Sequence, residues 1–201
     1  MDAHAEKQLE AIRQQLAHRE RELEAARRIS EVLFQHLTLD NVIDQALRTA
    51  VDVVNAETGS VILVDGESRQ LIFRYTLGAK PAPFGTAVPL EKSIAGAVFN
   101  SGEPLVIADV KQDARHYPRI DEMTGYCTRD LIALPLKRWE GRTIGVMELL
   151  NKREGRLNQD DLAILMIISA FTAIAIEQSW LFQEAKLAEV VRRLGDISHD
   201  V

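Results

Sequence analysis

The sequence predicts an α+β domain with a helical arm on either side, and three observations support this prediction. The first 37 residues contain no glycine or proline and are rich in good helix formers. Within 60–75 and within 131–150, two short apolar segments are joined by a polar turn, which is typical of β-hairpins. From residue 158 the chain again has the composition of a long helix. A length of 201 residues fits one domain of ordinary size with extensions.

The composition is that of a folded protein from a reducing compartment. Hydrophobic residues make up 46% of the chain, and the net charge is −6 without a basic cluster, so we expect no nucleic-acid partner. The single cysteine, Cys127, fits the cytoplasm. The charged first ten residues indicate no signal peptide. The most apolar stretch, 162–176, is shorter than the roughly 20 residues that span a bilayer, so we expect a buried helix and no membrane insertion.

Residues 1–37 form the expected N-terminal coiled-coil helix. Its apolar residues alternate at spacings of three and four, a heptad pattern that is weakened at Arg19 and Ser30. Those residues are Leu9, Ile12, Leu16, Leu23, Ala26, Leu33 and Leu37. Because a lone helix leaves so narrow a stripe exposed, we expect the same helix of a second copy to cover it, giving a homodimer. A single amphipathic helix packed on its own domain remains the alternative.

Residues 38–178 form the expected globular domain, which begins with a helix. Thr38 is a suitable N-cap, and the apolar residues between 42 and 54 fall on one helical face. The first hairpin pairs residues 60–65 with 71–75.

The second half of this domain contains a long connection. A short helix at about 93–101 and a strand at 105–107 are followed by a polar stretch, 108–128, with one helical turn. A connection of that length inside a compact domain usually has a function. The second hairpin pairs 131–136 with 143–150, and Pro135 predicts a bulge or an edge there.

Residues 179–201 continue a helix that begins near Asn158, which can cap it with Asp160 and Asp161 in the first turn. The helix is apolar on nearly all sides as far as Ile176, and a heptad seam with one polar slot, Gln183, follows. The seam consists of Ile176, Trp180, Leu187, Val190, Leu194, Ile197 and Val201. Two flanking coiled-coil helices predict a parallel dimer.

Catalytic and metal-binding patterns are absent from the sequence. We find no Ser-His-Asp arrangement, no phosphate-binding loop and no zinc-ligand spacing, so we expect no enzyme activity from this chain alone and no metal. His116, near Asp113 and Asp121, is expected to be solvated rather than a ligand. Glu148 lies between two apolar residues of a strand, so it either faces solvent or lines a pocket.

The middle region resembles a GAF domain, and most specifically those of cyclic-nucleotide phosphodiesterases. Three segments carry the resemblance: Ser93-Ile-Ala-Gly96, the loop from Ile107 to Thr128, and Gly145 to Lys152. The family implies an antiparallel sheet of about six strands flanked by helices. It also implies a small-molecule pocket beneath the 108–128 loop.

The resemblance further implies which residues line that pocket and what they bind. The implied ligand-binding residues are Ser60, Ile94, Ala95, Tyr117, Asp121, Thr124, Thr128 and Glu148. Backbone N–H groups of Ile94 and Ala95 suit a phosphate, and the threonine hydroxyls suit a purine edge. Phe73 or Tyr75 could stack on a flat ring. The implied ligand is cyclic AMP, cyclic GMP or another small molecule, with no cofactor fixed. For Ser60, Tyr117 and Thr124 a purely structural role stays open.

The cyclic-nucleotide members of the family carry a further motif, which this chain matches in part. Asn151, Lys152 and Asp161 match it, whereas Leu157 and Leu162 replace a phenylalanine and a glutamate. In that family the lysine–aspartate pair braces the pocket without touching the ligand. The partial match leaves the identity of the ligand open.

The segment Ile197 to Val201 resembles the start of a histidine-kinase dimerisation helix. By this resemblance His199 is the phosphoacceptor and Asp200 assists proton removal. We therefore expect the input module of a cytoplasmic sensor histidine kinase, with a response regulator as a further partner and an ATP-binding domain elsewhere in the parent protein. A regulatory domain of another effector, such as a cyclase, a phosphodiesterase or a transcription activator, and a ligand-free dimerisation scaffold are the alternatives.

Overall fold

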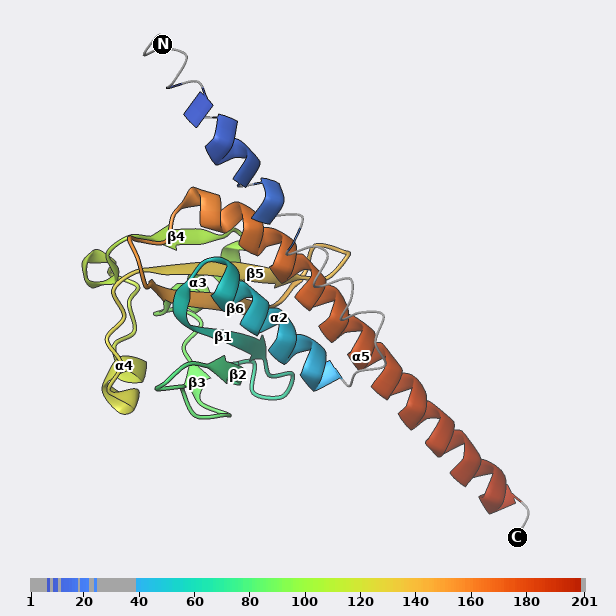
Figure 1. Ribbon diagram of the computed structural model, residues 1–201. Coiled ribbons are helices and arrows are strands. Elements are labelled where there is room, and N and C mark those ends of the chain that lie inside the picture. Colours follow the sequence, from blue (N-terminus) through green and yellow to red (C-terminus); the bar gives the residue numbers. More distant parts are fainter. Residues whose placement is uncertain are drawn as a thin grey trace.

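The computed structural model describes residues 39–199 continuously and, before them, residues 7, 9, 10, 12–17, 19–21 and 24; side chains at 39, 183, 185–187 and 189–199 are not described. One antiparallel sheet has the strand order β3-β2-β1-β6-β5-β4 (Figure 1). The helices are α2 (Leu39–Val53), α3 (Ile94–Ser101), the 3-10 turn η1 (Val110–Gln112), α4 (Arg119–Thr124) and α5 (Gln159–His199). The strands are β1 (Ala56–Val64), β2 (Leu71–Leu77), β3 (Ala87–Val88), β4 (Leu105–Ile107), β5 (Leu131–Lys137) and β6 (Thr143–Lys152).

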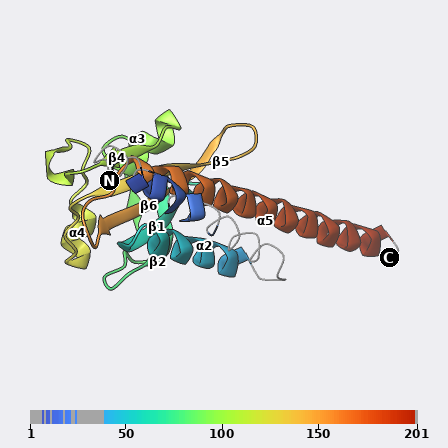
Figure 2. The same ribbon diagram turned by 45° about the horizontal axis from the view of Figure 1, so that its top comes forward.

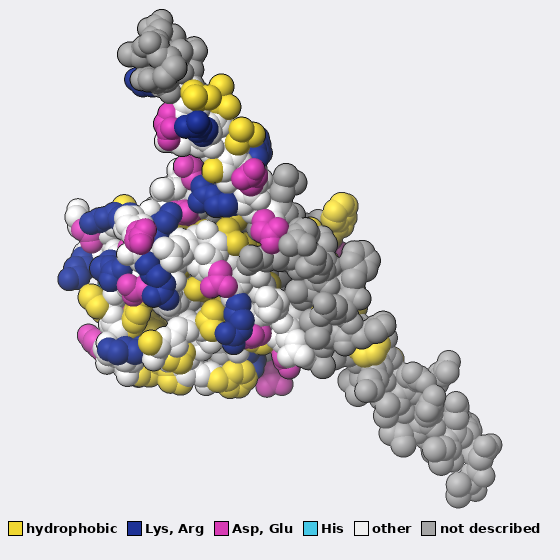
Figure 3. Space-filling view, in the orientation of Figure 1, with side chains coloured by type: hydrophobic (Ala, Val, Ile, Leu, Met, Phe, Trp, Pro, Cys, Tyr) yellow, Lys and Arg dark blue, Asp and Glu magenta, His cyan; other side chains and the backbone are white. Residues whose placement is uncertain are grey.

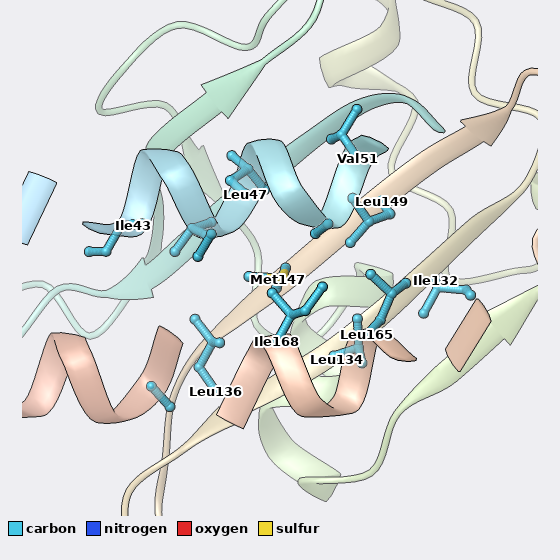
Figure 4. Close-up of a cluster of buried hydrophobic side chains, with 14 of the residues drawn as sticks. Ile43, Leu47, Val51, Ile132, Leu134, Leu136, Met147, Leu149, Leu165 and Ile168 are labelled. Atoms are coloured by element: carbon cyan, nitrogen blue, oxygen red, sulfur yellow. The ribbon is translucent and has the colours of Figure 1, made fainter. Parts of the chain in front are cut away.

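One face of the sheet is covered by α2 and α5, which pack against each other as well as on the strands (Figure 4). In α2, Ile43, Leu47 and Ala50 recur at helical spacing and are at most 1% exposed, so a single apolar stripe faces the core. Met147 and Leu149 of β6 meet this stripe and are fully buried. This layer is the main hydrophobic core.

The opposite face carries a second core beneath α3. Ile62 and Val146 alternate with the residues of the first core along β1 and β6, as the two-residue period of a strand requires. They pack with Ile94 and Val98 of α3. The sheet is therefore buried on both faces, by α2 and α5 on one face and by α3 on the other.

A β-bulge in the pairing of β1 with β2 reverses the direction of one aromatic side chain. Val61 is opposite Tyr75 and Ile62 is opposite Phe73, so the register shifts by one residue. Phe73 consequently packs in the second core, while Tyr75 packs against the first and donates a hydrogen bond to Asp40 at 2.5 Å. Phe73, and not Tyr75, is on the face of α3.

The α+β class and the six-stranded antiparallel sheet are as the sequence predicts. The two-residue strand β3 at the sheet edge was not expected from the sequence. Pro135 lies beyond the part of β5 that pairs with β4, and a register shift follows at Leu136, so the prediction of an edge or bulge describes this position well. Asn158 caps α5 by accepting from Asp161 N at 3.2 Å, and Asp161 accepts in return from Asn158 N at 3.0 Å.

Helix α5 departs from the expected seam in its first two positions. Ile176 is fully buried and Trp180 packs against the first core, so both face the chain's own domain. The reason is that α5 is apolar all round here, and the sheet and α2 take this face. Among the described side chains of α5, Met166, Ile174 and Leu181 remain about half exposed and Phe182 is 71% exposed.

Among the described residues, one stretch within α5, Gln159–Phe182, is long and apolar enough to cross a membrane by length and composition. The expectation that it is too short was therefore wrong. Residues of this stretch pack in the core on the sheet, and the core helix of a folded domain can have the same length and apolar composition as a membrane-spanning helix. Beyond this stretch α5 extends away from the domain (Figures 1 and 2).

The described part of the N-terminal arm is helical, and its apolar residues Leu9, Ile12 and Leu16 are each 50% exposed or more. Arg19 is helical, whereas the heptad positions 23, 26, 30, 33 and 37 and the proposed cap Thr38 lie outside the described residues. So do Asp200, Val201 and the side chains of the seam beyond Gln183.

Candidate ligand-binding site

A cavity of about 90 Å³ lies between the sheet, α3, and the segment that contains α4. It is on the face of the second core, away from α2 and α5. The structure brings all eight predicted ligand-binding residues to its wall, although they come from four separate segments: β1, α3, the 108–128 connection and β6. They are Ser60, Ile94, Ala95, Tyr117, Asp121, Thr124, Thr128 and Glu148.

The floor of the cavity is a polar row across three adjacent strands. Ser60 of β1 pairs with Thr76 of β2 on one side and with Glu148 of β6 on the other, so the three side chains share one face. Ser60 is 4% exposed, and its hydroxyl oxygen has no hydrogen-bond partner among the described residues. An unpaired buried hydroxyl is unfavourable unless something else supplies the bond.

Glu148 is the titratable group at the centre of this floor. Burial, with a further contribution from the nearby charge of Asp121, raises the pKa of its carboxyl to about 7. Near neutral pH the group is therefore present in both forms, and it can donate or accept a hydrogen bond. The two alternatives predicted for Glu148 were solvent and pocket, and the structure places it in the pocket wall.

The N-terminus of α3 forms another part of the wall. The Ser93 hydroxyl accepts from Gly96 N at 2.9 Å. The N–H groups of Ile94 and Ala95 precede the first intrahelical bond and have no acceptor among the described residues. Gly96 allows this tight packing, because a Cβ there would lie 2.2 Å from the carbonyl oxygen of Leu90. Two free N–H groups at a helix N-terminus favour an anion.

The segment around α4 covers the cavity and is tied down by its own polar groups. Asp121 accepts from the backbone N–H of Thr128 at 2.8 Å and from its hydroxyl at 2.7 Å. The Thr124 hydroxyl donates to Ile120 O at 2.8 Å within the helix. These hydroxyl protons are already engaged, so either threonine could donate to a purine edge only if these bonds rearranged, whereas its oxygen can still accept.

Several cavity residues were not predicted from the sequence. His116 lies in the wall with its side chain 22% exposed and its Nε2 3.9 Å from Asp121, so the expectation of a solvated histidine was wrong. Lys80, from the β2–β3 connection, donates to Gly125 O at 2.6 Å and connects that loop with the end of α4. Tyr126 also lines the cavity. No cluster able to hold a metal ion is found in the described part of the chain.

The predicted brace is present as a contact, but it does not line the cavity. Lys152 Nζ lies 2.7 Å from both carboxylate oxygens of Asp161, which is 2% exposed. The pair joins the end of β6 to the first turn of α5. Leu157, which replaces the family's phenylalanine, is buried beside it in the first core.

The predicted phosphoacceptor lies far from this site along the chain. The backbone of α5 continues to His199, but its side chain is not described, and Asp200 lies outside the described residues. On the surface that Figure 3 shows, acidic and basic side chains are interspersed over the domain.

Comparison with known proteins places this architecture in a family. The family model of the GAF domain matches residues 36–177. The dual 3',5'-cyclic-AMP and -GMP phosphodiesterase 11A of Takifugu rubripes is 32% identical over 168 residues, which cover 74% of this chain and 19% of that protein. The probable 3',5'-cyclic phosphodiesterase pde-5 of Caenorhabditis elegans is 26% identical and covers 79% and 23%. The chain thus spans about a fifth of the length of these relatives.

Solved structures agree on the fold. The GAF domain of the phosphoenolpyruvate-protein phosphotransferase from Acinetobacter is similar with a TM-score of 0.69 at 16% identity, over 81% of this chain and 97% of that one. The antiparallel sheet, the cavity beneath α4 and the family match over residues 36–177 together show that this chain belongs to the GAF domain family.

Proposed function

We propose that this chain is the ligand-sensing, dimerising input module of a cytoplasmic signalling protein, and that its cavity binds a cyclic nucleotide. The unpaired hydroxyl of Ser60 carries this proposal. A polar atom so buried is usually satisfied, and this one faces a cavity that also contains Glu148 and two free N–H groups of α3.

The chemistry of the wall matches the parts of a cyclic nucleotide. The N–H groups of Ile94 and Ala95 suit the phosphate, and Phe73 offers an aromatic surface to the base. Ser60 and Glu148 suit a purine edge, which has donors and acceptors side by side. The two phosphodiesterase relatives, which act on cyclic nucleotides by name, support the same class of ligand. Since typical pockets for drug-sized ligands hold roughly 300–1,000 Å³, we expect α4 to move outwards on binding.

Native mass spectrometry and thermal shift with cyclic AMP and cyclic GMP test this proposal. We expect one of them to bind and to raise the melting temperature. Ser60→Ala should weaken that binding about fivefold, because one hydrogen bond contributes about 1 kcal/mol. Without ligand, the same variant should be at least as stable as the wild type, since it removes an unpaired buried hydroxyl. Ser68→Ala, in an exposed turn, is the matched control. Absence of binding by both nucleotides would contradict the choice of ligand.

We further propose that the effector downstream is a histidine kinase. The supporting observations are the segment Ile197 to Val201 and the uninterrupted helix α5 that leads to His199. In this proposal His199 receives the phosphoryl group, Asp200 assists, and a response regulator is the next partner. The residues that follow Val201 in the parent protein provide the test. An asparagine and a proline shortly downstream on the same helix support a kinase, and their absence contradicts it.

Two other functions each have an observation in their favour. Identity of 32% with a phosphodiesterase favours a regulatory domain of another effector, such as a phosphodiesterase or a cyclase. The small volume of the cavity favours a ligand-free dimerisation scaffold. The experiments with cyclic nucleotides and with the parent sequence separate these from the preferred function.

A further inference from the structure

The cavity and the helix α5 lie on opposite faces of the sheet, so a ligand in the cavity cannot touch α5 directly. The cavity lies on the α3 face of the sheet, whereas α5 packs on the opposite face. Any influence of the cavity on α5 must therefore pass through the sheet or around its end. The connection from α4 to β5 leads around that end, because it begins in the cavity wall and finishes beside the end of β6.

Tyr126 in this connection lines the cavity, and its hydroxyl binds Glu57, which is not among the lining residues. The hydroxyl donates to Glu57 Oε2 at 2.9 Å. The same carboxylate accepts from Arg129 Nη2 at 2.8 Å and from Asn151 Nδ2 at 3.2 Å. Burial raises the pKa of Glu57, but the hydrogen bonds from Arg129, Tyr126 and Asn151 outweigh it and hold the pKa below its ordinary value. Glu57 is thus an ionised centre that gathers three donors.

Asn151 connects Glu57 with the end of β6, where Asn151 itself lies. It is 1% exposed and has a left-handed backbone with φ of 57°. Its Oδ1 accepts from Arg129 N at 2.7 Å, and its Nδ2 also donates to Cys127 O at 2.9 Å. The side chain therefore holds the α4–β5 connection against the last residues of β6.

The next contacts reach α5. Asp130, 2% exposed, accepts from Leu157 N at 2.9 Å and from Lys152 N at 3.3 Å. Lys152 is paired with Asp161 in the first turn of α5. A set of hydrogen bonds, most of them partly buried, thus runs from the cavity wall at Tyr126 to the start of the helix.

We propose that Tyr126, through its hydrogen bond to Glu57, is the positioning residue that couples occupancy of the cavity to the start of α5. A ligand that displaces the Tyr126 ring removes a donor from Glu57. The carboxylate and its partners Arg129 and Asn151 then rearrange, which loosens the segment from Lys152 to Asp161. This inference rests on the proposed function for its ligand, but the link itself is a property of the chain.

Hydrogen–deuterium exchange on the full chain without ligand tests the link. Tyr126→Phe keeps the ring and removes the donor, so exchange in the 152–161 segment should become about three- to tenfold faster, as expected when one partly exposed hydrogen bond of ordinary strength is lost. Tyr75→Phe is the matched control, because it removes a phenol–carboxylate bond to Asp40 at the start of α2. It should leave the 152–161 segment unchanged.

The outcomes are decisive in each direction. Faster exchange confined to the 152–161 segment and the α4–β5 connection supports the link. No change there, or a uniform increase over the whole domain, overturns it. A second variant, Glu57→Gln, should produce the same local effect, and adding Tyr126→Phe to it should produce little more, because both act on the same bond.

Cyclic AMP and cyclic GMP then serve as probes of coupling. If one of them binds, it should change exchange in the 152–161 segment of the wild type and change it much less in Tyr126→Phe. If both proteins respond equally, the coupling through Tyr126 is wrong, although the proposal that the cavity binds this nucleotide still holds. If neither binds, the proposed ligand fails, and the ligand-free experiment still decides the link.

Discussion

At the scale of single residues, two polar side chains in the cavity wall have, among the described residues, none of the hydrogen-bond partners that buried groups of this kind usually have. Ser60 has a hydroxyl without a partner, and Glu148 has a carboxyl whose pKa is raised to about 7 by burial and by Asp121. The unpaired hydroxyl and, above neutral pH, the ionised carboxyl each lower the stability of the fold. Such groups are typical of sites where folding free energy is given up for binding.

Glu148 gives the domain a defined dependence of stability on pH. Its pKa in the folded state, about 7, exceeds the ordinary value of 4.5, so the folded state holds the proton more tightly. Its contribution is complete below pH 4.5 and is lost as the pH rises to about 7. We expect Glu148→Gln to gain about 2–3 kcal/mol in free energy of unfolding relative to the wild type between pH 4 and pH 8.

Urea unfolding at pH 4, 6 and 8 measures this difference. Glu154→Gln, at an exposed position outside the cavity, is the matched control and should follow the wild type at every pH. Parallel curves for Glu148→Gln and the wild type would show that the carboxyl is better solvated than its position in the cavity wall indicates.

The candidate site was predictable from sequence only where residue type and motif coincide. The family motif led to eight wall residues, and the structure gathers them around one cavity. Alternation along a strand could not decide between Phe73 and Tyr75, because a bulge of one residue moves Tyr75 to the other face. The roles of Glu57 and Tyr126 depend on partners 69 positions apart, which no local pattern reveals.

At the scale of elements, several polar contacts gather at the joint between β6 and α5. Asp130 accepts two backbone N–H groups there, and the Lys152–Asp161 pair closes it. Asp161 also accepts from Asn158 N, so the carboxylate serves the helix cap as well. This joint fixes the direction in which α5 leaves the sheet.

Removing one partner of this pair should be costly. Lys152→Met keeps the apolar stem but leaves the Asp161 carboxylate, whose side chain is 3% exposed, without its cation. We expect a loss of about 3 kcal/mol in the free energy of unfolding, measured by urea at pH 7. Arg48→Met breaks the exposed Arg48–Asp44 pair and should leave stability close to that of the wild type. Equal effects of both variants would mean that the joint is held by its backbone bonds alone.

Helices and strands were predicted correctly where the apolar pattern continues over many residues, and a strand was missed where it spans only two residues. Helices α2 and α5 and both hairpins follow from repeated apolar spacing and from a cap at Asn158. The strand β3 has only two residues, Ala87 and Val88, and exists because β2 offers it an edge. The seam at Ile176 and Trp180 was misassigned because an all-round apolar helix does not show which face its own domain will cover.

At the scale of the whole molecule, apolar residues of both arms remain half exposed in the described part of the chain. Met166, Ile174 and Leu181 recur along the outward side of α5 at helical spacing, and Leu9 and Ile12 are similarly exposed in the N-terminal arm. We propose that a second copy of the chain covers them. A parallel, two-fold arrangement brings each residue of this stripe against or close to its own copy.

This geometry makes dimerisation sensitive to a charge on the stripe. Ile174→Arg combined with Leu181→Arg places four cations in one interface of the dimer, which should convert a dimer to a monomer in sedimentation velocity while circular dichroism stays unchanged. Phe84→Arg is the matched control, since Phe84 is 73% exposed and lies in the β2–β3 connection rather than on α5. It should remain dimeric. A wild-type chain that sediments as a monomer at high concentration, or a doubly substituted chain that stays dimeric, would show that α5 does not pair with its copy through this stripe, and rotation of paired helices could not then transmit the state of the cavity.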